Sequence, residues 1–119
     1  MKKQEKWLKN SFKEKEKDKK MKPIERAKKF ITEENLWIYL LTLAKDQEVP
    51  EEKAREMIFE KFGFLPSLFL TKRVIFLLKK DGYLKKEKYL GKNAFSTTEK
   101  GKKEIEEFKK FLKEISEKI

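Results

Sequence analysis

Residues Ser67–Lys103 read SLFLTKRVIFLLKKDGYLKKEKYLGKNAFSTTEKGKK, and this stretch decides the fold. Its first part is an apolar helical run that ends at Asp81-Gly82, where the glycine is typical of a residue that follows a helix. Two short lysine-rich segments come next, and Thr98 is a typical residue to begin a further helix. The stretch contains eleven Lys/Arg and three Asp/Glu, a net charge of +8 in a chain whose total is +11.

The segment after the glycine has the residues of a β-hairpin. Tyr83–Tyr89 and Ala94–Thr97 contain aromatic and β-branched residues, which favour strands. Leu90-Gly91-Lys92-Asn93 joins them, and its Gly and Asn suit a hairpin turn. The last helix then begins at Thr98, with Glu99 in its first turn, where a negative charge is favourable.

Upstream of this stretch, the hydrophobic spacing predicts further helices. Thr32 is the expected N-cap of a central helix, because the segment after it is apolar over most of a helix circumference. Pro50 and Gly63 are the expected start and C-terminal cap of the next helix. The predicted helices cover Pro23–Phe30, Asn35–Lys45 and Pro50–Phe62, followed by a helix that begins at Ser67 and runs to about Lys80. Counted from Asn35–Lys45, this last one is the third helix of the winged-helix fold.

Together these elements are the parts of a winged helix-turn-helix with a two-stranded β wing. The predicted fold class is therefore mainly α (α+β). Three regions are expected: a basic N-terminal arm over residues 1–22, the winged-helix domain over residues 23–97, and a C-terminal dimerisation helix over residues 98–119.

The composition predicts a polyanionic partner. Charged residues make up 45% of the chain, far above the usual quarter, and the sequence pI is about 9.7. A chain this basic is typical of proteins that bind DNA, RNA or an anionic membrane surface. High lysine and glutamate content without cysteine is also typical of proteins from a thermophile.

The sequence contains no cysteine and no histidine, which removes several kinds of site. Thiolate zinc sites, disulfides, cysteine nucleophiles and histidine general bases are excluded, and no other nucleophile–base pair is evident. We therefore expect no metal, no cofactor and no enzymatic activity. No window approaches 18 apolar residues, and the first thirty residues lack a signal-peptide pattern, so we expect a cytoplasmic protein that does not enter a membrane.

The N-terminal arm carries ten lysines and four acidic residues. Trp7, Leu8 and Phe12 lie at helical spacing within it, whereas Lys13–Lys20 is charged throughout. Two interpretations remain open, a solvated basic extension or a segment whose aromatic residues dock on another surface.

The last helix has the clearest periodicity in the chain. Its apolar residues are spaced 3, 4, 3 and 4 apart, the pattern of a coiled-coil seam: Ile105, Phe108, Leu112, Ile115 and Ile119. We predict that this seam forms a homodimer, because three other helices already cover a small core. The alternative is that the helix packs back on its own domain.

In a winged helix-turn-helix, the third helix enters the major groove and the ribbon lies along the DNA backbone. The predicted DNA contacts on the third helix are the polar residues of its first turns, Thr71, Lys72 and Arg73. The predicted contacts on the ribbon are Lys85, Lys86, Lys88, Lys92 and Asn93. Taken singly, each lysine is better explained as a solubilising surface charge, so the prediction depends on their clustering.

The third helix also has apolar residues beyond those that a core stripe needs. Phe69, Leu70, Phe76 and Leu77 leave little polar surface for a DNA groove. We expect some of them to be covered by another element, such as the aromatic arm or a partner subunit, with DNA binding then mainly electrostatic.

The run RVIFLLKKDGYLKKEKYLGKNAFSTTEKGKKEIEEF resembles winged-helix transcriptional regulators, and most specifically the PadR-like family. Leu78–Leu84 is similar to the family's pattern of a helix end, a glycine and an aromatic residue before the wing. Phe95–Gly101 is similar to its aromatic-x-Leu-Thr-x-x-Gly motif, with Thr97 in place of the leucine. Over about Asn35–Ile115, the resemblance implies a DNA-binding homodimer built on the C-terminal helix.

These observations lead to the hypothesis of a dimeric transcriptional regulator, a repressor that binds a palindromic operator in double-stranded DNA. Two alternatives remain open. One is a sequence-tolerant architectural nucleic-acid-binding protein, and the other is a winged helix that binds a protein partner within a larger complex. The sequence does not identify a small-molecule effector.

Overall fold

The computed structural model describes residues 21–119, so the predicted arm and its aromatic residues lie almost wholly outside the described part. The chain divides into two units at the boundary between Phe30 and Ile31. Helix α2 (Pro23–Thr32) begins at the proline, as predicted. A proline suits the first helical position because its missing N–H has no intrahelical partner there.

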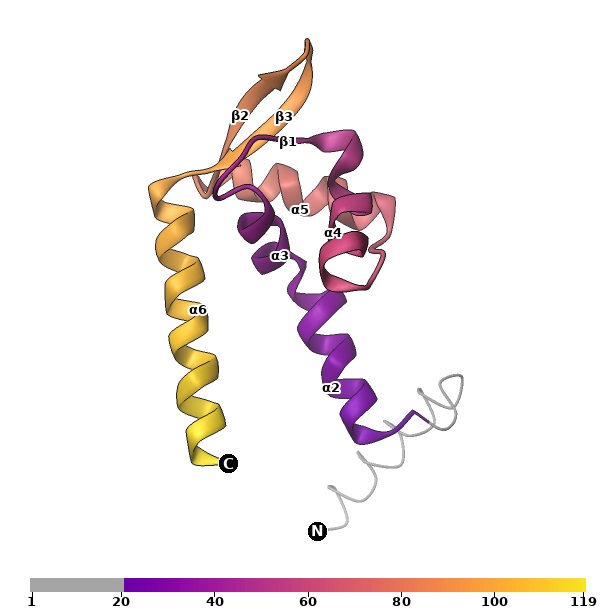
Figure 1. Cartoon of the computed structure of the whole chain (residues 1–119), viewed down its shortest axis with the longest axis vertical. Helices are drawn as coiled ribbons and strands as arrows, with labels where there is room; N and C mark the ends of the chain where they lie inside the picture. The colour runs from indigo at the N-terminus through magenta and orange to yellow at the C-terminus, as the bar shows by residue number, and fades with distance from the viewer. Residues whose placement is uncertain (1–20) are drawn as a thin grey trace. The chain divides into compact units, whose positions relative to one another are not determined.

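In the second unit, short helices are followed by a small sheet and a long last helix (Figure 1). The turns η2 and η3 are single 3₁₀ turns. In chain order the elements are η2 (Glu33–Asn35), α3 (Leu36–Leu43), β1 (Val49–Pro50), η3 (Glu51–Lys53), α4 (Ala54–Phe62), α5 (Leu68–Lys80), β2 (Leu84–Tyr89), β3 (Lys92–Thr97) and α6 (Glu99–Lys118).

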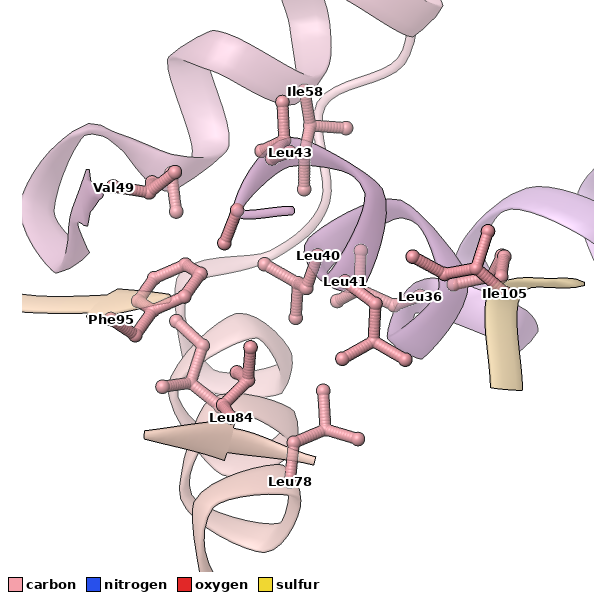
Figure 2. Close-up of a cluster of buried hydrophobic side chains, with 14 residues drawn as sticks. Leu36, Leu40, Leu41, Leu43, Val49, Ile58, Leu78, Leu84, Phe95 and Ile105 are labelled. Atoms are coloured by element: carbon pink, nitrogen blue, oxygen red, sulfur yellow. The ribbon is translucent and has the colours of Figure 1, made fainter. Parts of the chain in front are cut away.

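Helix α3 lies at the centre of the hydrophobic core, as predicted (Figure 2). Leu36, Leu40 and Leu41 are almost wholly buried, and Leu43 points toward α4. A helix that is apolar over most of its circumference must be covered on several sides. The residues that cover it come from the other helices of this unit and from the sheet: Ala54, Ile58, Ile75, Leu78, Leu84, Phe95 and Ile105.

A short strand joins the hairpin and makes the sheet three-stranded. β1 pairs antiparallel with β3, which gives the order β1-β3-β2. The sequence predicts only two strands and a helix that starts at Pro50, because a two-residue strand carries no alternation pattern. Val49 is fully buried opposite Phe95, so β1 fastens the base of the wing to the core, and the helical residues begin after Pro50.

The hairpin turns more tightly than the sequence indicates. The predicted four-residue turn over Leu90–Asn93 is wrong, because only Leu90 and Gly91 separate β2 from β3. Their φ angles are 51° and 78°. Two successive residues with positive φ match the right-handed twist of the strands that they join. Lys92 and Asn93 are therefore strand residues, with side chains on the faces of the wing.

Two of the predicted helix caps, Gly63 and Thr98, are confirmed, and Ser67, the first residue of the predicted third helix, is the N-cap of α5. The Ser67 Oγ accepts a backbone hydrogen bond at 3.1 Å at the start of α5, and the Thr98 Oγ1 accepts one at 3.2 Å at the start of α6. Gly63 ends α4 with a φ of 83°, a conformation that favours glycine. The prediction for Thr32 is wrong, because this residue is the last of α2 and makes no side-chain cap to the turn that follows.

The apolar seam of α6 divides into two parts. Ile105 is 3% exposed within the core, and the Phe108 ring packs edge-on against Trp37 with 5.5 Å between the ring centroids. This first part packs on its own domain, so Ile105 is not available as a dimer contact. The remaining residues of the seam are exposed: Leu112, Ile115 and Ile119.

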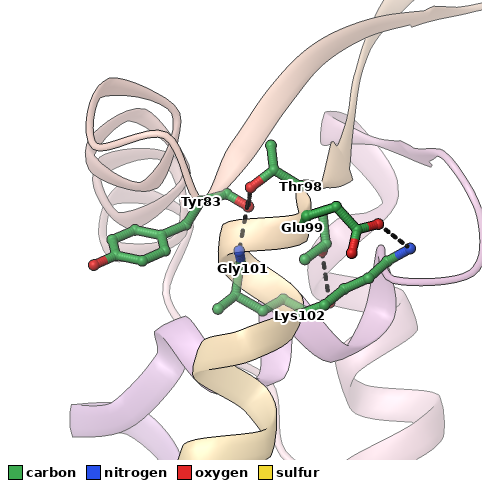
Figure 3. A network of polar contacts seen from close by, with 7 residues as sticks. Tyr83, Thr98, Glu99, Gly101 and Lys102 are labelled. Carbon is green, nitrogen blue, oxygen red and sulfur yellow. Dashed lines mark hydrogen bonds and ion pairs between the residues drawn. The ribbon is translucent and has the colours of Figure 1, made fainter.

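β3 and α6 meet the residues that follow α5 at a junction of hydrogen bonds from threonine side chains and the backbone; Figure 3 shows the part around Tyr83, Thr98 and Gly101. The Thr97 Oγ1 donates to the Leu41 carbonyl at 2.7 Å inside the core. The Thr98 Oγ1 donates to the Gly82 carbonyl at 2.7 Å, and the Thr98 N donates to the Tyr83 carbonyl at 3.0 Å. The junction therefore holds the base of the wing and the first turn of α6 against α3 and the end of α5.

We expect Gly101→Ala to destabilise the fold by about 2 kcal/mol, although alanine is the better helix former. A Cβ at this position would lie 2.6 Å from the Thr97 Cγ2 atom and closer still to the Tyr83 carbonyl oxygen. Urea unfolding followed by circular dichroism measures the change in the free energy of unfolding. Lys103→Ala, an exposed change in the same helix, is the control and should shift that free energy by less than about 0.5 kcal/mol. Equal stability of the two variants would contradict the expected clash.

Candidate nucleic-acid interface

Helix α5 turns one face to the core and the opposite face to solvent. Its buried residues are Thr71, Ile75 and Leu78. The opposite face is defined by three exposed residues at positions i, i+4 and i+7: Phe69, Arg73 and Phe76. Of the apolar residues that we expected to be covered, Leu70 packs against the core, whereas Phe69, Phe76 and Leu77 are exposed in the described part of the chain.

Thr71 is the predicted DNA contact that the structure places in the core. Its side chain is 2% exposed, and its hydroxyl donates to the Ser67 carbonyl at 2.7 Å. A buried hydroxyl that is bonded to its own helix does not reach a base edge, so we leave Thr71 out of the interface. The next two predicted residues, Lys72 and Arg73, are exposed.

A cleft of about 900 Å³ lies between α5, η3 and the wing. The side chains that line the cleft include Lys72, Phe76 and Lys79 from α5 and Lys88, Lys92 and Asn93 from the wing. At one end, the Arg55 Nε donates to the Pro66 carbonyl at 2.8 Å and holds the turn between α4 and α5. The cleft thus brings Lys72 of the third helix together with three of the residues predicted on the wing.

The strand register divides the predicted wing residues between two faces. Lys86 and Lys88 share one face because they are two residues apart, and the Lys88 Nζ donates to the Asn93 Oδ1 across the strands at 2.7 Å. Lys85 lies on the other face, where its Nζ is 3.4 Å from the Glu87 carboxylate. Lys88 and Asn93 line the cleft from the first face. Lys92, although it pairs with Tyr89 on the opposite face, also lines the cleft, whereas Lys85 and Lys86 do not.

Two glutamates that no sequence pattern points to lie in the same cleft. Glu51 forms an ion pair with Lys79, and the Glu52 carboxylate is 2.9 Å from the Lys92 Nζ. Both pairs are partly exposed, so each is weak enough to exchange for another anion. The partners are 28 and 40 residues apart in the sequence, which explains why local spacing does not reveal them.

Within residues 21–119, no three acidic side chains are grouped so as to hold a metal ion. Across the same described range, no helix has the length and apolar character needed to cross a membrane. The side chains that line the cleft carry ammonium, guanidinium, amide, hydroxyl and carboxylate groups beside apolar surface.

Solved structures of three winged-helix proteins superpose on this chain. A winged-helix DNA-binding protein from STIV matches 68% of this chain and 89% of its own chain, with 28% identity and a TM-score of 0.60. PadR of Bacillus subtilis in complex with operator DNA matches 61% of this chain, with 18% identity and a TM-score of 0.55. A PadR-like transcriptional regulator from Bacillus cereus matches 60% of this chain, with 20% identity and a TM-score of 0.50.

These matches confirm the predicted fold class, a mainly helical winged helix-turn-helix, and they confirm the PadR-like resemblance at the level of the fold. The matched region spans 45% and 44% of the two PadR chains, less than half of each. No protein-family model and no curated protein sequence matches this chain.

Proposed function

We propose that this chain is a homodimeric transcriptional regulator that binds double-stranded DNA, with α5 in the major groove and the wing along the phosphate backbone. The observation that carries the proposal is the cleft in which Lys72, Lys88 and Lys92 converge from two elements. The superposition on a PadR protein solved in complex with operator DNA supports the same use of this fold.

The distribution of charge also supports a DNA partner. Ser67–Lys103 has a net charge of +8, whereas Ile24–Pro66 has seven Lys/Arg and nine Asp/Glu, a net of −2. The positive charge of the described residues is therefore concentrated on α5, the wing and the start of α6. Duplex DNA carries one phosphate per about 1.7 Å of its axis, so closely spaced lysines contact several phosphates at once.

The exposed part of the α6 seam supports a dimer. Leu112, Ile115 and Ile119 continue the spacing that Ile105 begins in the core, and Phe111 widens the exposed stripe. A stripe with this spacing is best buried against a matching helix of a second copy. A two-fold dimer places its two α5 helices about one DNA turn apart, so we expect an imperfectly palindromic operator and repression by competition for promoter DNA.

Lys88→Gln combined with Lys92→Gln should make the negative slope of log K for DNA binding against log[salt] shallower by about 1.8, because each lost phosphate contact contributes about 0.9. Fluorescence anisotropy of a labelled duplex at several salt concentrations measures the slope. Lys110→Gln combined with Lys113→Gln changes the net charge equally on exposed positions of α6 and should leave the slope unchanged. An unchanged slope in the wing variant would show that the wing does not contact the backbone.

Glu52→Gln should raise DNA affinity about two- to fivefold at low salt, because it removes a carboxylate that competes with phosphate for Lys92. The same anisotropy titration measures the effect. Glu56→Gln is the matched control, since it removes an exposed charge of α4 that does not line the cleft. If both variants gained affinity equally, the cause would be net charge and not competition for Lys92.

Leu112→Ser combined with Ile115→Ser should convert the dimer into a monomer, because both side chains belong to the exposed part of the seam. Analytical ultracentrifugation measures the mass, and thermal unfolding should stay cooperative because neither residue is part of the core. Lys110→Ser combined with Lys113→Ser is the control in the same turns. A wild-type chain that sediments as a monomer even at high concentration would contradict the proposed dimer.

A further inference from the structure

Two phenylalanines on the outward face of α5 are the most exposed apolar side chains of that helix. Phe69 is 78% exposed and Phe76 is 64% exposed. They are seven residues apart, so they lie on one face and about 10 Å apart along the helix axis. Aromatic rings left in water are unfavourable, so this face is suited to a partner with apolar groups.

The same face is also positively charged. Arg73 lies between the two rings, Lys72 lies beside them, and Lys80 follows one turn after Phe76. Phe76 lines the cleft that the wing lysines also line. A purely apolar protein surface would leave the guanidinium of Arg73 without a counter-charge. The partner that fits this face therefore combines apolar groups with negative charge.

The major groove of DNA offers both kinds of group. Phosphates border it, and the C5 methyl group of thymine is the apolar group that projects into it from the base edges. Contact between a phenylalanine ring and a thymine methyl group is an established mode of base reading, as is a bidentate bond from arginine to guanine O6 and N7. Phe69 and Arg73 lie in the N-terminal half of α5, the part of a recognition helix that reaches base edges.

We infer that Phe69 and Phe76 read thymine methyl groups on the two sides of a guanine that Arg73 contacts. The inference rests on the proposed function, because it requires α5 in the major groove. A separation of about 10 Å corresponds to about three base pairs at a rise of 3.4 Å. Each half-site of the operator is therefore expected to contain a guanine with a thymine within about two base pairs on each side.

The test uses the full chain and an operator duplex recovered by selection from a random pool. Each thymine of a half-site is replaced in turn by deoxyuridine, which removes the methyl group and changes nothing else. Burial of one methyl group changes affinity about fourfold, so we expect a loss of about three- to fivefold at one or two thymines per half-site. Replacement of the other thymines should leave the affinity unchanged.

Phe69→Ala and Phe76→Ala assign each ring to its methyl group. In each variant, replacing the thymine that the deleted ring contacts by deoxyuridine should no longer change the affinity. Replacing the thymine that the other ring contacts should still lower it. Phe59→Ala is the matched control, because Phe59 is also an exposed phenylalanine but belongs to α4, and this variant should keep both differences. All three rings are exposed, so the variants should unfold cooperatively near the wild-type temperature.

Equal affinity of the thymine and deoxyuridine duplexes for the wild-type chain would overturn the inference, as would a selection that yields no preferred sequence. Either result would leave DNA binding itself supported if the wild-type chain still bound duplexes with a steep salt dependence. A wild-type chain that bound no DNA at low salt would overturn both the inference and the proposed function, and it would favour a protein partner for this face.

Discussion

The surfaces of α5, the wing and α6 all depend on the close approach of α6 to the backbone at Gly101. Because this residue has no side chain, the first turn of α6 packs directly on the Tyr83 carbonyl. Thr98 bonds the carbonyls at the end of α5, and Thr97 bonds the Leu41 carbonyl within the core. The wing therefore leaves and rejoins the domain at one anchored point. These hydrogen bonds and the pairing of β1 with β3 hold the base of the wing beside α5.

Two lysines of the cleft form ion pairs that can exchange their glutamate partner for another anion. Lys79 and Lys92 are each held by a glutamate of η3, and the pairs are partly exposed, so each contributes little to stability. Such pairs keep the lysines in place without burying them. In the proposed complex these lysines would contact phosphates, and such contacts position a protein on a nucleic acid, whereas base reading requires other groups. The outward face of α5, with Arg73 between two phenylalanines, is where the proposed base reading is concentrated.

The apolar stripe of α6 packs on the core in its first turns and is exposed in its later turns. Ile105 completes the core, and Phe108 packs against Trp37 at its edge, whereas the rest of the stripe extends beyond the domain. Packing on its own domain, one of the two interpretations of the seam, therefore applies to the first turns of the stripe. Pairing with a second copy stays a proposal for the exposed turns that follow. A helix shared in this way would couple the geometry of the proposed dimer to the base of the wing. The reason is that Thr98, the N-cap of α6, directly follows the last residue of β3.

The sequence by itself determined the order of the elements and most of their ends, because caps such as Ser67 and Thr98 act on residues three positions away. It did not reveal β1, whose two residues carry no periodicity. The tertiary structure decided which side chains face the core and which face solvent, turning Thr71 inward and placing Glu52 beside Lys92. The same helical spacing fits a core stripe, a dimer seam or a groove-facing stripe. Only packing between elements distant in the sequence selects among them, since those contacts leave no local pattern.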